Sequence, residues 1–420
     1  AENFTDVVIS IKASNTVVMV KTVRLLVDVM EKEGMNFPLH LGVTEAGDGE
    51  DGRIKSALGI GALLSDGLGD TIRVSLSEAP EAEIPVARKL VDYVLLRQEH
   101  PYIPGLEAPE FNYLSPERRK TKAVRNIGGE HVPVVIADRM DGKTEVNPQF
   151  TPDYIYAGRA LPEQREEGVE YILDADVWQG EAGTWPAFNH AQLPLMGECD
   201  AALKFLFIPY MAQTDEVIAC LKYHPEVVII SQSNHPNRLG EHRALVHQLM
   251  TEGLQNPVVF FQHYAEDDAE NLQIKSAADM GALIFDGLCD GIFLFNQGSL
   301  SHAVVDATAF GILQAGRTRT SKTEYISCPG CGRTLYDLEK TIARIKAATS
   351  HLKGLKIGIM GCIVNGPGEM ADADYGYVGA GRGKISLYKG KVCVEKNIPE
   401  EEAVERLLEF IRTDREENQQ

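Results

Sequence analysis

The sequence lacks the long apolar runs that membrane proteins need. It contains no stretch of about 18 apolar residues that could cross a bilayer, and no basic, apolar-cored signal segment opens it. These absences predict a cytoplasmic protein, or one of the plastid stroma if the source is a plant or alga. The chain starts at Ala1 and enters a buried-strand pattern within a few residues. We therefore expect that an N-terminal portion, with any targeting segment, is absent from this sequence.

Basic residues and cysteines are also few. Lysine and arginine number 41 against 61 aspartates and glutamates, which gives a net charge of −20. This balance argues against broad contact with nucleic acid or an anionic membrane, so an anionic ligand would need a local basic pocket. The seven cysteines are an odd number spread over 420 residues. They indicate a reducing compartment and not a disulfide framework.

Three of these cysteines stand in one stretch of the chain. It opens with Cys328-Pro329-Gly330-Cys331 and closes with a Gly-rich loop, residues 361–369, that contains Cys362. A Pro-Gly turn brings the two flanking sulfurs to one side, and the later loop lets a bulky group approach the backbone. From these residues alone, three readings stay open: an iron–sulfur cluster, a zinc site completed by His351 or Cys393, and buried thiols without metal.

The first part of the chain reads as three βα units in a row. Strands are predicted at residues 7–14, 39–45 and 71–77, each with one polar and one apolar face. Such units imply a parallel sheet, and a parallel barrel has its active site at the carboxyl ends of its strands. A barrel needs about eight strands, so we expect these to be the last part of one. The residues predicted to meet at the strand ends are Lys12, Thr44, Glu45, Arg73 and Ser75.

Each of these residues has a functional and an ordinary interpretation. Lys12 and Arg73 would be costly inside a barrel unless they meet an anion, which favours contact with substrate phosphate. Glu45 follows Thr44 at a strand end, which favours catalysis, although it could be a simple loop charge. For Ser75 the ordinary interpretation is that its hydroxyl group merely completes a hydrogen bond.

A second αβ series predicts another barrel-like domain in the middle of the chain. Residues 54–75 align without gaps to residues 274–295, with identity at about 12 of 22 positions, so the second series is predicted to repeat the first. Phe293 and Phe295 stand where the first copy has Arg73 and Ser75, which predicts a structural spacer that binds no diphosphate. The strands predicted for this series are 132–137, 154–157, 170–173, 203–208, 226–230, 258–262 and 291–295.

The longest motifs resemble one known family. They are residues 39–47, the segment Cys328-Pro329-Gly330-Cys331-Gly332-Arg333, and residues 362–369, and they occur in the order found in hydroxymethylbutenyl diphosphate synthase in its large, plant-type, three-domain form. The resemblance implies an α/β fold in three parts. These are the C-terminal part of a TIM-type βα barrel (1–90), a linker with a barrel-like insert domain (91–320), and an α+β iron–sulfur domain (321–420). The last part should contain a helix from 399 to 412 and a frayed polar tail from 414 to 420.

The same resemblance implies a reaction and a cofactor. An oxidoreductase of the methylerythritol phosphate route to isoprenoids would open 2-C-methyl-D-erythritol 2,4-cyclodiphosphate reductively to 4-hydroxy-3-methylbut-2-enyl diphosphate, with loss of water. It would use a 4Fe-4S cluster on Cys328, Cys331, Cys362 and Glu369, with Glu369 exchangeable for a substrate oxygen and Glu45 supplying a proton. Ferredoxin or flavodoxin would donate the electrons. A homodimer is the possible assembly. The alternatives are an iron–sulfur electron carrier, which would normally use four cysteines, and a zinc-scaffolded binding module.

Overall fold

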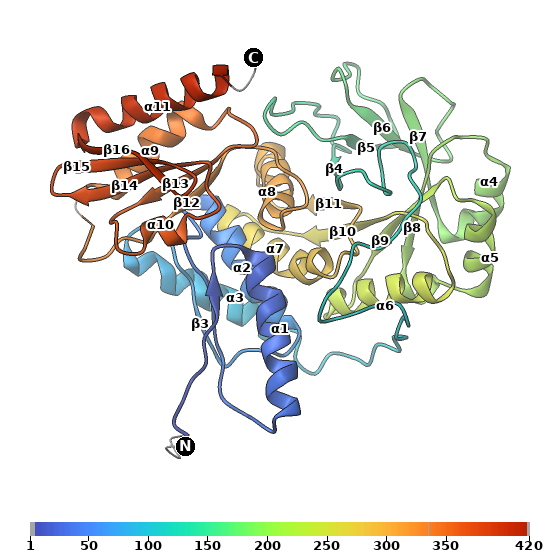
Figure 1. Ribbon diagram of the computed structural model, residues 1–420. Helices are drawn as coiled ribbons and strands as arrows, with labels where there is room; N and C mark the ends of the chain where they lie inside the picture. The colour runs from blue at the N-terminus through green and yellow to red at the C-terminus, as the bar shows by residue number, and fades with distance from the viewer. Residues whose placement is uncertain (1–4, 335, 418–420) are drawn as a thin grey trace. The chain divides into compact units, whose positions relative to one another are not determined.

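The computed structural model describes residues 5–334 and 336–417, and the chain divides into two compact units (Figure 1). The first unit joins the two ends of the chain: residues up to Leu63, Gly67–Lys89, and those from Thr320 on. The second consists of Leu64–Asp66 and Leu90–Arg319. Because the first unit contains both ends, this division does not separate the first predicted domain from the third. The predicted limits 1–90, 91–320 and 321–420 stay predictions.

A three-stranded parallel sheet forms the N-terminal part of the first unit. Its strands are β1 (Lys12–Ala13), β2 (His40–Val43) and β3 (Thr71–Arg73), in that order. The strands are shorter than the predicted 7–14, 39–45 and 71–77, because the ladder exists only where two neighbours run side by side. Beyond it, single residue pairs such as Ile9 and Leu39 continue the contact.

Three helices follow these strands. They are α1 (Thr16–Lys32), α2 (Gly49–Ser65) and, after the 3₁₀ turn η1 (Pro80–Ala82), α3 (Glu83–Leu95). The helix α2 packs so closely on β2 that a Cβ atom at Gly59 would lie 2.8 Å from Cγ2 of Val43. None of the helices in the described part of the chain is both long and apolar enough to cross a membrane.

A five-stranded sheet forms the C-terminal part of the first unit. The strands β12 (Glu324–Ser327), β13 (Lys356–Met360) and β14 (Tyr375–Gly381) are parallel, and β15 (Lys384–Lys389) and β16 (Val392–Pro399) continue the sheet antiparallel. The helices α9 (Leu338–Thr349) and α11 (Glu400–Glu417) cover one face (Figure 1) and share its apolar core. The short helix α10 (Gly366–Glu369) follows β13.

The helix α11 corrects the predicted polar tail. It continues to Glu417, and Asp414 near its end is only 9% exposed and accepts a hydrogen bond from the Tyr375 hydroxyl at 2.8 Å. A partner from another element thus holds residues that looked like a solvated end. The part of the predicted tail from 418 to 420 lies outside the described residues.

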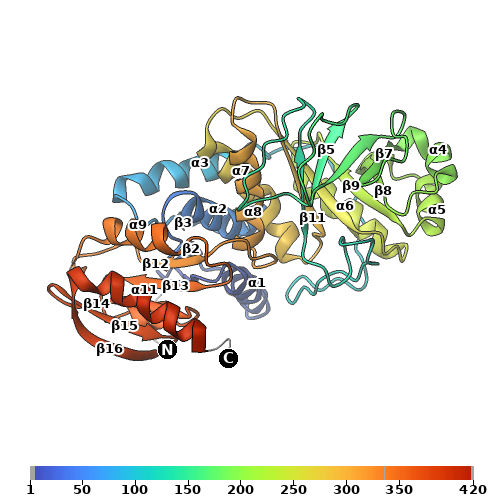
Figure 2. The same ribbon diagram turned by 90° about the horizontal axis from the view of Figure 1, so that it is seen from above.

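The second unit contains a closed parallel barrel, which confirms the predicted βα fold class. Eight strands make it, one more than the sequence predicted, and the missed strand is β7 (Thr184–Asn189). Figure 2 shows the barrel from a second direction, with α4 (Leu193–Glu198) and α5 (Asp215–Tyr223) on its outer side. The other helices are α6 (Arg238–Thr251), α7 (Ala269–Phe285) and α8 (His302–Ala315). The strands are β4 (Val134–Asp138), β5 (Tyr154–Gly158), β6 (Glu170–Asp174), β7 (Thr184–Asn189), β8 (Lys204–Pro209), β9 (Val227–Gln232), β10 (Val258–Tyr264) and β11 (Gly291–Asn296).

The two copies of the internal repeat form the same local structure. In the first copy α2 is followed by β3, and in the second α7 is followed by β11. Both helices have 17 residues and begin and end at aligned positions. At aligned strand positions, however, Arg73 is exposed whereas Phe293 is 1% exposed and belongs to the interior cluster of the barrel.

Phe293 is therefore expected to be a strong determinant of barrel stability. Phe293→Ser should lower the free energy of unfolding of the second unit by about 4 kcal/mol, because it leaves a cavity and buries a hydroxyl without a partner. Phe293→Leu fills more of the space and should cost about 1 kcal/mol. Urea unfolding of both variants measures the difference. Equal stability of the two would show that the position is not a packed interior one.

Candidate active site

Within the first unit, the N-terminal and C-terminal segments meet at the carboxyl ends of β2 and β3. Ala46 forms a parallel β-bridge with Ser327, the last residue of β12. The hydroxyl groups of Ser77 and Ser327 lie 2.8 Å apart, and Lys55 Nζ lies 3.3 Å from Glu324 Oε1. Because Glu45 precedes this bridge and Cys328 follows it, the bridge brings a barrel strand end beside the first cysteine.

A cavity of about 230 Å³ opens at this junction. Seven of the nine site residues predicted from the sequence line it: Thr44, Glu45, Arg73, Cys328, Cys331, Cys362 and Glu369. The other two, Lys12 and Ser75, are not among its lining residues. Ser75 is buried, and its hydroxyl oxygen has no hydrogen-bond partner among the described residues.

Backbone amides hold two of the cysteines. The amide of Gly361 donates to Cys328 Sγ at 3.2 Å, and the amide of Arg333 donates to Cys331 Sγ at 3.4 Å. The second contact lowers the pKa of the exposed Cys331 thiol, whereas burial raises the pKa of Cys328. Gly330 between them has φ +77°, which a side chain rarely tolerates. The Pro-Gly turn thus places both sulfurs on the same cavity, in surroundings that favour a thiolate at Cys331.

The third cysteine and the glutamate come from the loop after β13. Cys362 follows this strand directly, and Glu369 ends α10. A Cβ atom at Gly361 would lie 2.5 Å from Thr334 Oγ1, so only glycine fits where this loop passes the first cysteine pair. Across residues 5–334 and 336–417, no three His, Cys, Asp or Glu side chains lie close enough together to hold a single metal ion. Three thiols and a carboxylate spaced around one cavity are a donor set that fits a larger iron–sulfur group.

The residues that would complete a zinc site lie elsewhere. His351 lines a different cavity, beside Leu352 and Arg412. Cys393 lies within β16, where its thiol contacts the carbonyl oxygen of Glu395 at 3.6 Å. Neither residue lines the cavity of the three cysteines.

Glu45 combines backbone strain with burial. Its φ of 49° lies in the left-handed region that few non-glycine residues adopt, and its side chain is 6% exposed. Burial raises the pKa of Glu45 to about 7, helped by the nearby Glu369 charge and opposed by a hydrogen bond from Thr44 and by Arg73. A carboxyl group in this state can donate a proton near neutral pH.

This raised pKa predicts a pH-dependent stability. Since the folded chain holds the Glu45 proton more tightly than the unfolded chain, the contribution is full below about pH 4.5 and is lost as the pH rises to about 7. The loss should be at most about 3 kcal/mol. Urea unfolding of the metal-free chain and of its Glu45→Gln variant should show a stability difference that changes over this pH range. A difference that stays constant from pH 4.5 to 8 would contradict the prediction.

Two cations lie in one row across the sheet. Lys12 on β1 and Arg73 on β3 are both in register with Gly42 on β2. Gly42 has no side chain to separate them. A Cβ atom there would lie 3.4 Å from Lys12 Cε and 3.2 Å from the Arg73 carbonyl oxygen, so the space between the two residues is narrow. Burial, and then the Arg73 charge, lowers the pKa of Lys12. Two like charges held together in this way favour an anion between them.

Two further polar residues line the cavity. Arg333 follows the cysteine pair, and a side-chain hydrogen bond to Cys331, together with the charge of that thiolate, raises the pKa of Arg333. Asn365 was missed by the sequence reasoning. The available signal was an amide side chain inside the Gly-rich loop, one residue before Gly366.

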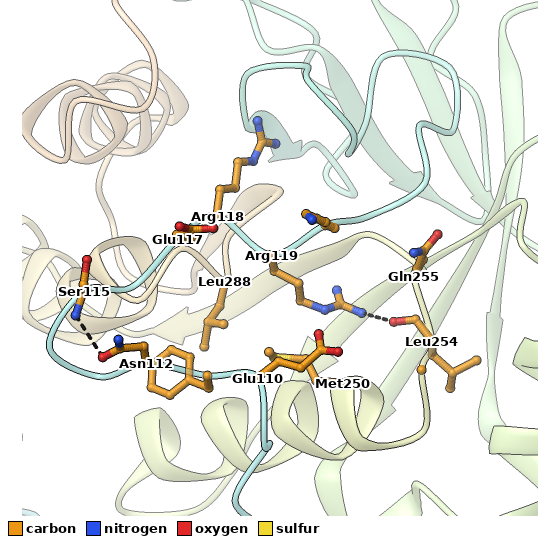
Figure 3. A pocket seen from close by; sticks show the side chains of 13 residues that line it. Glu110, Asn112, Ser115, Glu117, Arg118, Arg119, Met250, Leu254, Gln255 and Leu288 are labelled. Atoms are coloured by element: carbon orange, nitrogen blue, oxygen red, sulfur yellow. Dashed lines mark hydrogen bonds between the residues drawn. The ribbon is translucent and has the colours of Figure 1, made fainter.

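Within the second unit, the linker and the amino-terminal end of the closed barrel line a separate cavity of about 650 Å³ (Figure 3). Its arginines are engaged with the protein itself. Arg119 donates to the carbonyl oxygens of Leu254 (2.6 Å) and Asn256 (2.9 Å), and Arg118 pairs with Asp290 at 3.2 Å. These contacts attach the linker to the amino-terminal end of the barrel. In barrels of this kind, residues at that end contribute to stability, and catalytic residues lie at the carboxyl-terminal end.

The fold and the first cavity together indicate a class of protein. A βα sheet presents Thr44, Glu45 and Arg73 at its strand ends to a cavity that three cysteines also line. This arrangement is typical of an oxidoreductase that combines a barrel with a cysteine-bound metal centre.

The comparisons with known proteins give the family. Residues 1–88 match the family model described as GcpE TIM-barrel domain, and residues 324–413 match the GcpE protein C-terminal domain. The chain is 94% identical over 417 residues to 4-hydroxy-3-methylbut-2-en-1-yl diphosphate synthase (flavodoxin) of Bacteroides thetaiotaomicron. The aligned region covers 99% of this chain and 68% of that protein. Proteins of the same name from Parabacteroides distasonis and Leptospira interrogans are 59% and 36% identical, over 98% and 97% of this chain and 67% and 68% of their own lengths.

The chain belongs to the family of 4-hydroxy-3-methylbut-2-en-1-yl diphosphate synthases, which are iron–sulfur oxidoreductases of isoprenoid biosynthesis. This confirms the family and the enzyme class that the motifs predicted. It does not favour the electron carrier or the zinc-scaffolded module. The chain spans about two thirds of the length of the curated relatives that it matches.

Proposed function

We propose that this chain carries the redox centre and part of the substrate site of a 4-hydroxy-3-methylbut-2-enyl diphosphate synthase. The substrate would be 2-C-methyl-D-erythritol 2,4-cyclodiphosphate. Its ring would open on uptake of two electrons and two protons, with release of one water. The observation that carries the proposal is the shared cavity, in which three cysteines and Glu369 face Thr44, Glu45 and Arg73.

The substrate's diphosphate would bind to the cations of the barrel segment. Lys12 and Arg73 lie in one row across the sheet, and Arg333 lines the cavity from the other side of the bridge. The positive charges of Lys12 and Arg73 repel each other. A bound anion would offset this repulsion, which favours anion binding between them.

Glu45 would act as the general acid. A hydroxyl group leaves poorly unless it takes up a proton, and a carboxyl with a pKa of about 7 holds one at neutral pH. Thr44 and Arg73 would orient it, since both act on its charge. Its backbone is strained, and it lines the cavity that the three cysteines also line.

Cys328, Cys331, Cys362 and Glu369 would hold a 4Fe-4S cluster, which when bound supplies electrons one at a time. A carboxylate is a weaker ligand than a thiolate, so Glu369 would be the ligand that holds the cluster least tightly. Flavodoxin, which the names of the relatives include, would donate the electrons in preference to ferredoxin. Because these relatives are bacterial, we place the protein in the cytoplasm. The domain limits 1–90, 91–320 and 321–420 are part of the proposal. A homodimer stays a prediction.

Anaerobic purification tests the proposal. We expect a brown, oxygen-sensitive protein with about four irons and matching sulfide per chain. Metal analysis and a visible absorption spectrum measure this, because zinc gives no visible absorption. Stoichiometric zinc without iron would overturn the assignment.

A further inference from the structure

The closed barrel of the second unit ends in a cavity of about 500 Å³. Its lining residues come from the strands, among them Tyr156 on β5, Phe207 on β8 and Phe261 on β10, and from the segments that follow the carboxyl ends of the strands. Barrels bind their ligands at this end, and the volume lies in the range of small-molecule sites, about 300–1,000 Å³. The mouth of this barrel is therefore hollow, although the repeat has lost the polar residues of the first copy.

Aromatic rings make the floor of this cavity. Tyr156, Phe207, Phe261 and Phe293 contact one another with ring centroids between 5.0 and 6.4 Å apart, and Phe295 stacks on Phe261 at 5.9 Å. Phe293 is buried beneath the others, which keep part of their surface open. Open aromatic surface in a concave site favours a ligand that covers it.

The rim is acidic. The Tyr156 hydroxyl donates to Asp174 Oδ1 at 2.6 Å, and Asp176 also lines the cavity. The lining cation, Arg159, is exposed and pairs with both carboxylates, at 2.8 Å to Asp176 and at 4.0 Å to Asp174. Two carboxylates against one guanidinium group leave the rim with a net negative charge. At the positions aligned with Arg73 and Ser75, this barrel has Phe293 and Phe295. Such a rim repels phosphates and carboxylates and attracts a positive charge.

We propose that this barrel mouth binds a small organic cation that carries a flat ring, such as an arylalkylammonium ion. The ring covers Phe261 and Phe295, and the ammonium group lies beside Asp174 and the electron-rich face of Tyr156. Aromatic faces and carboxylates both attract ammonium groups, and the two effects reinforce each other where the site is partly dehydrated. The site lies within the second unit and does not depend on the proposed reaction.

Calorimetric titration of the 420-residue chain with three matched probes tests this site. The probes are benzylamine, which is cationic at neutral pH, benzyl alcohol and benzoate. Benzylamine should bind with a Kd of about 1 mM or tighter. It should bind at least about tenfold more tightly than benzoate, with the alcohol between them. Absence of saturable benzylamine binding, or equal affinity for benzoate, would overturn the proposal.

Three variants place the binding in the barrel mouth. Asp174→Asn keeps the shape of the rim and should weaken benzylamine about tenfold while leaving benzyl alcohol unchanged. Phe295→Leu should weaken both about threefold. The control is Glu198→Gln, an exposed acid at the end of α4 that does not line the cavity.

The control and the second variant keep the test decisive. Equal losses in Glu198→Gln and Asp174→Asn would show that benzylamine senses only the net negative charge of the chain, and would refute the site. Thermal unfolding of each variant comes first. If Asp174→Asn does not fold, Phe295→Leu decides alone, and unchanged affinity for benzylamine in that variant would also refute the site.

Discussion

Serine in place of Cys328, Cys331 or Cys362 is expected to remove the iron–sulfur cluster, and with it all turnover of the cyclodiphosphate. The three sulfurs line one cavity, and the remaining predicted ligand there is a carboxylate. Two thiolates and one weak oxygen ligand cannot hold a cluster that normally takes four cysteines. Iron, sulfide and visible absorption of the anaerobically purified variants measure the effect.

Cys393→Ser is the matched control for these variants. Cys393 lies in β16 and does not line the cavity, so its loss should leave iron content and turnover unchanged. Glu369→Ala should be intermediate, with a cluster that three thiolates assemble but that is more labile and turns over poorly. Cluster loss in Cys393→Ser with none in Glu369→Ala would show that Cys393, and not Glu369, is the fourth ligand.

Glu45→Gln is expected to lower turnover by a factor of about 10²–10⁴ with the cluster intact. The amide keeps the size of the carboxyl group but has no proton to donate, and loss of a positioned general acid costs about this much. Single-turnover rates with a reduced electron donor measure the loss in the complete enzyme. Glu31→Gln, at an exposed position on α1, is the control and should have no effect.

The pH profile separates this role from a structural one. Because the pKa of Glu45 is about 7 and the acid form is the active one, turnover should fall as the pH rises above 7. This limb should be absent in Glu45→Gln, whose residual rate should not respond to pH there. An unchanged profile in the variant would mean that another group supplies the proton.

The closed barrel shows what strand patterns can and cannot predict. Seven of its strands follow runs of apolar residues that the sequence displays, and the internal repeat relates α2 and β3 to α7 and β11. The eighth, β7, contains Pro186, which lacks a backbone donor and argues against a strand within a sheet. It nevertheless pairs in parallel with β6 and β8 on its two sides. Closure of the barrel, and not local propensity, made residues 184–189 a strand.

The motifs of the candidate site depend on local chemistry, so they could be predicted from the sequence alone. A Pro-Gly turn between two cysteines, a third cysteine in a Gly-rich loop, and Glu369 after a rigid Gly-Pro-Gly are all short-range patterns. They sufficed for the family and for the proposed ligand set. Lys12, Glu45 and Arg73 followed from strand periodicity in the same way.

Only the tertiary structure decided which of these residues share a cavity. Glu45 lies beside Cys328 because Ala46 and Ser327 pair across segments far apart in the chain, a contact that no local pattern encodes. The pKa of Glu45 rises because the fold buries its carboxyl group, and Lys12 and Arg73 stand in one row because register aligns both with Gly42. Spacing along the chain determines what a short segment can bind, whereas burial and register depend on partners that the fold alone supplies.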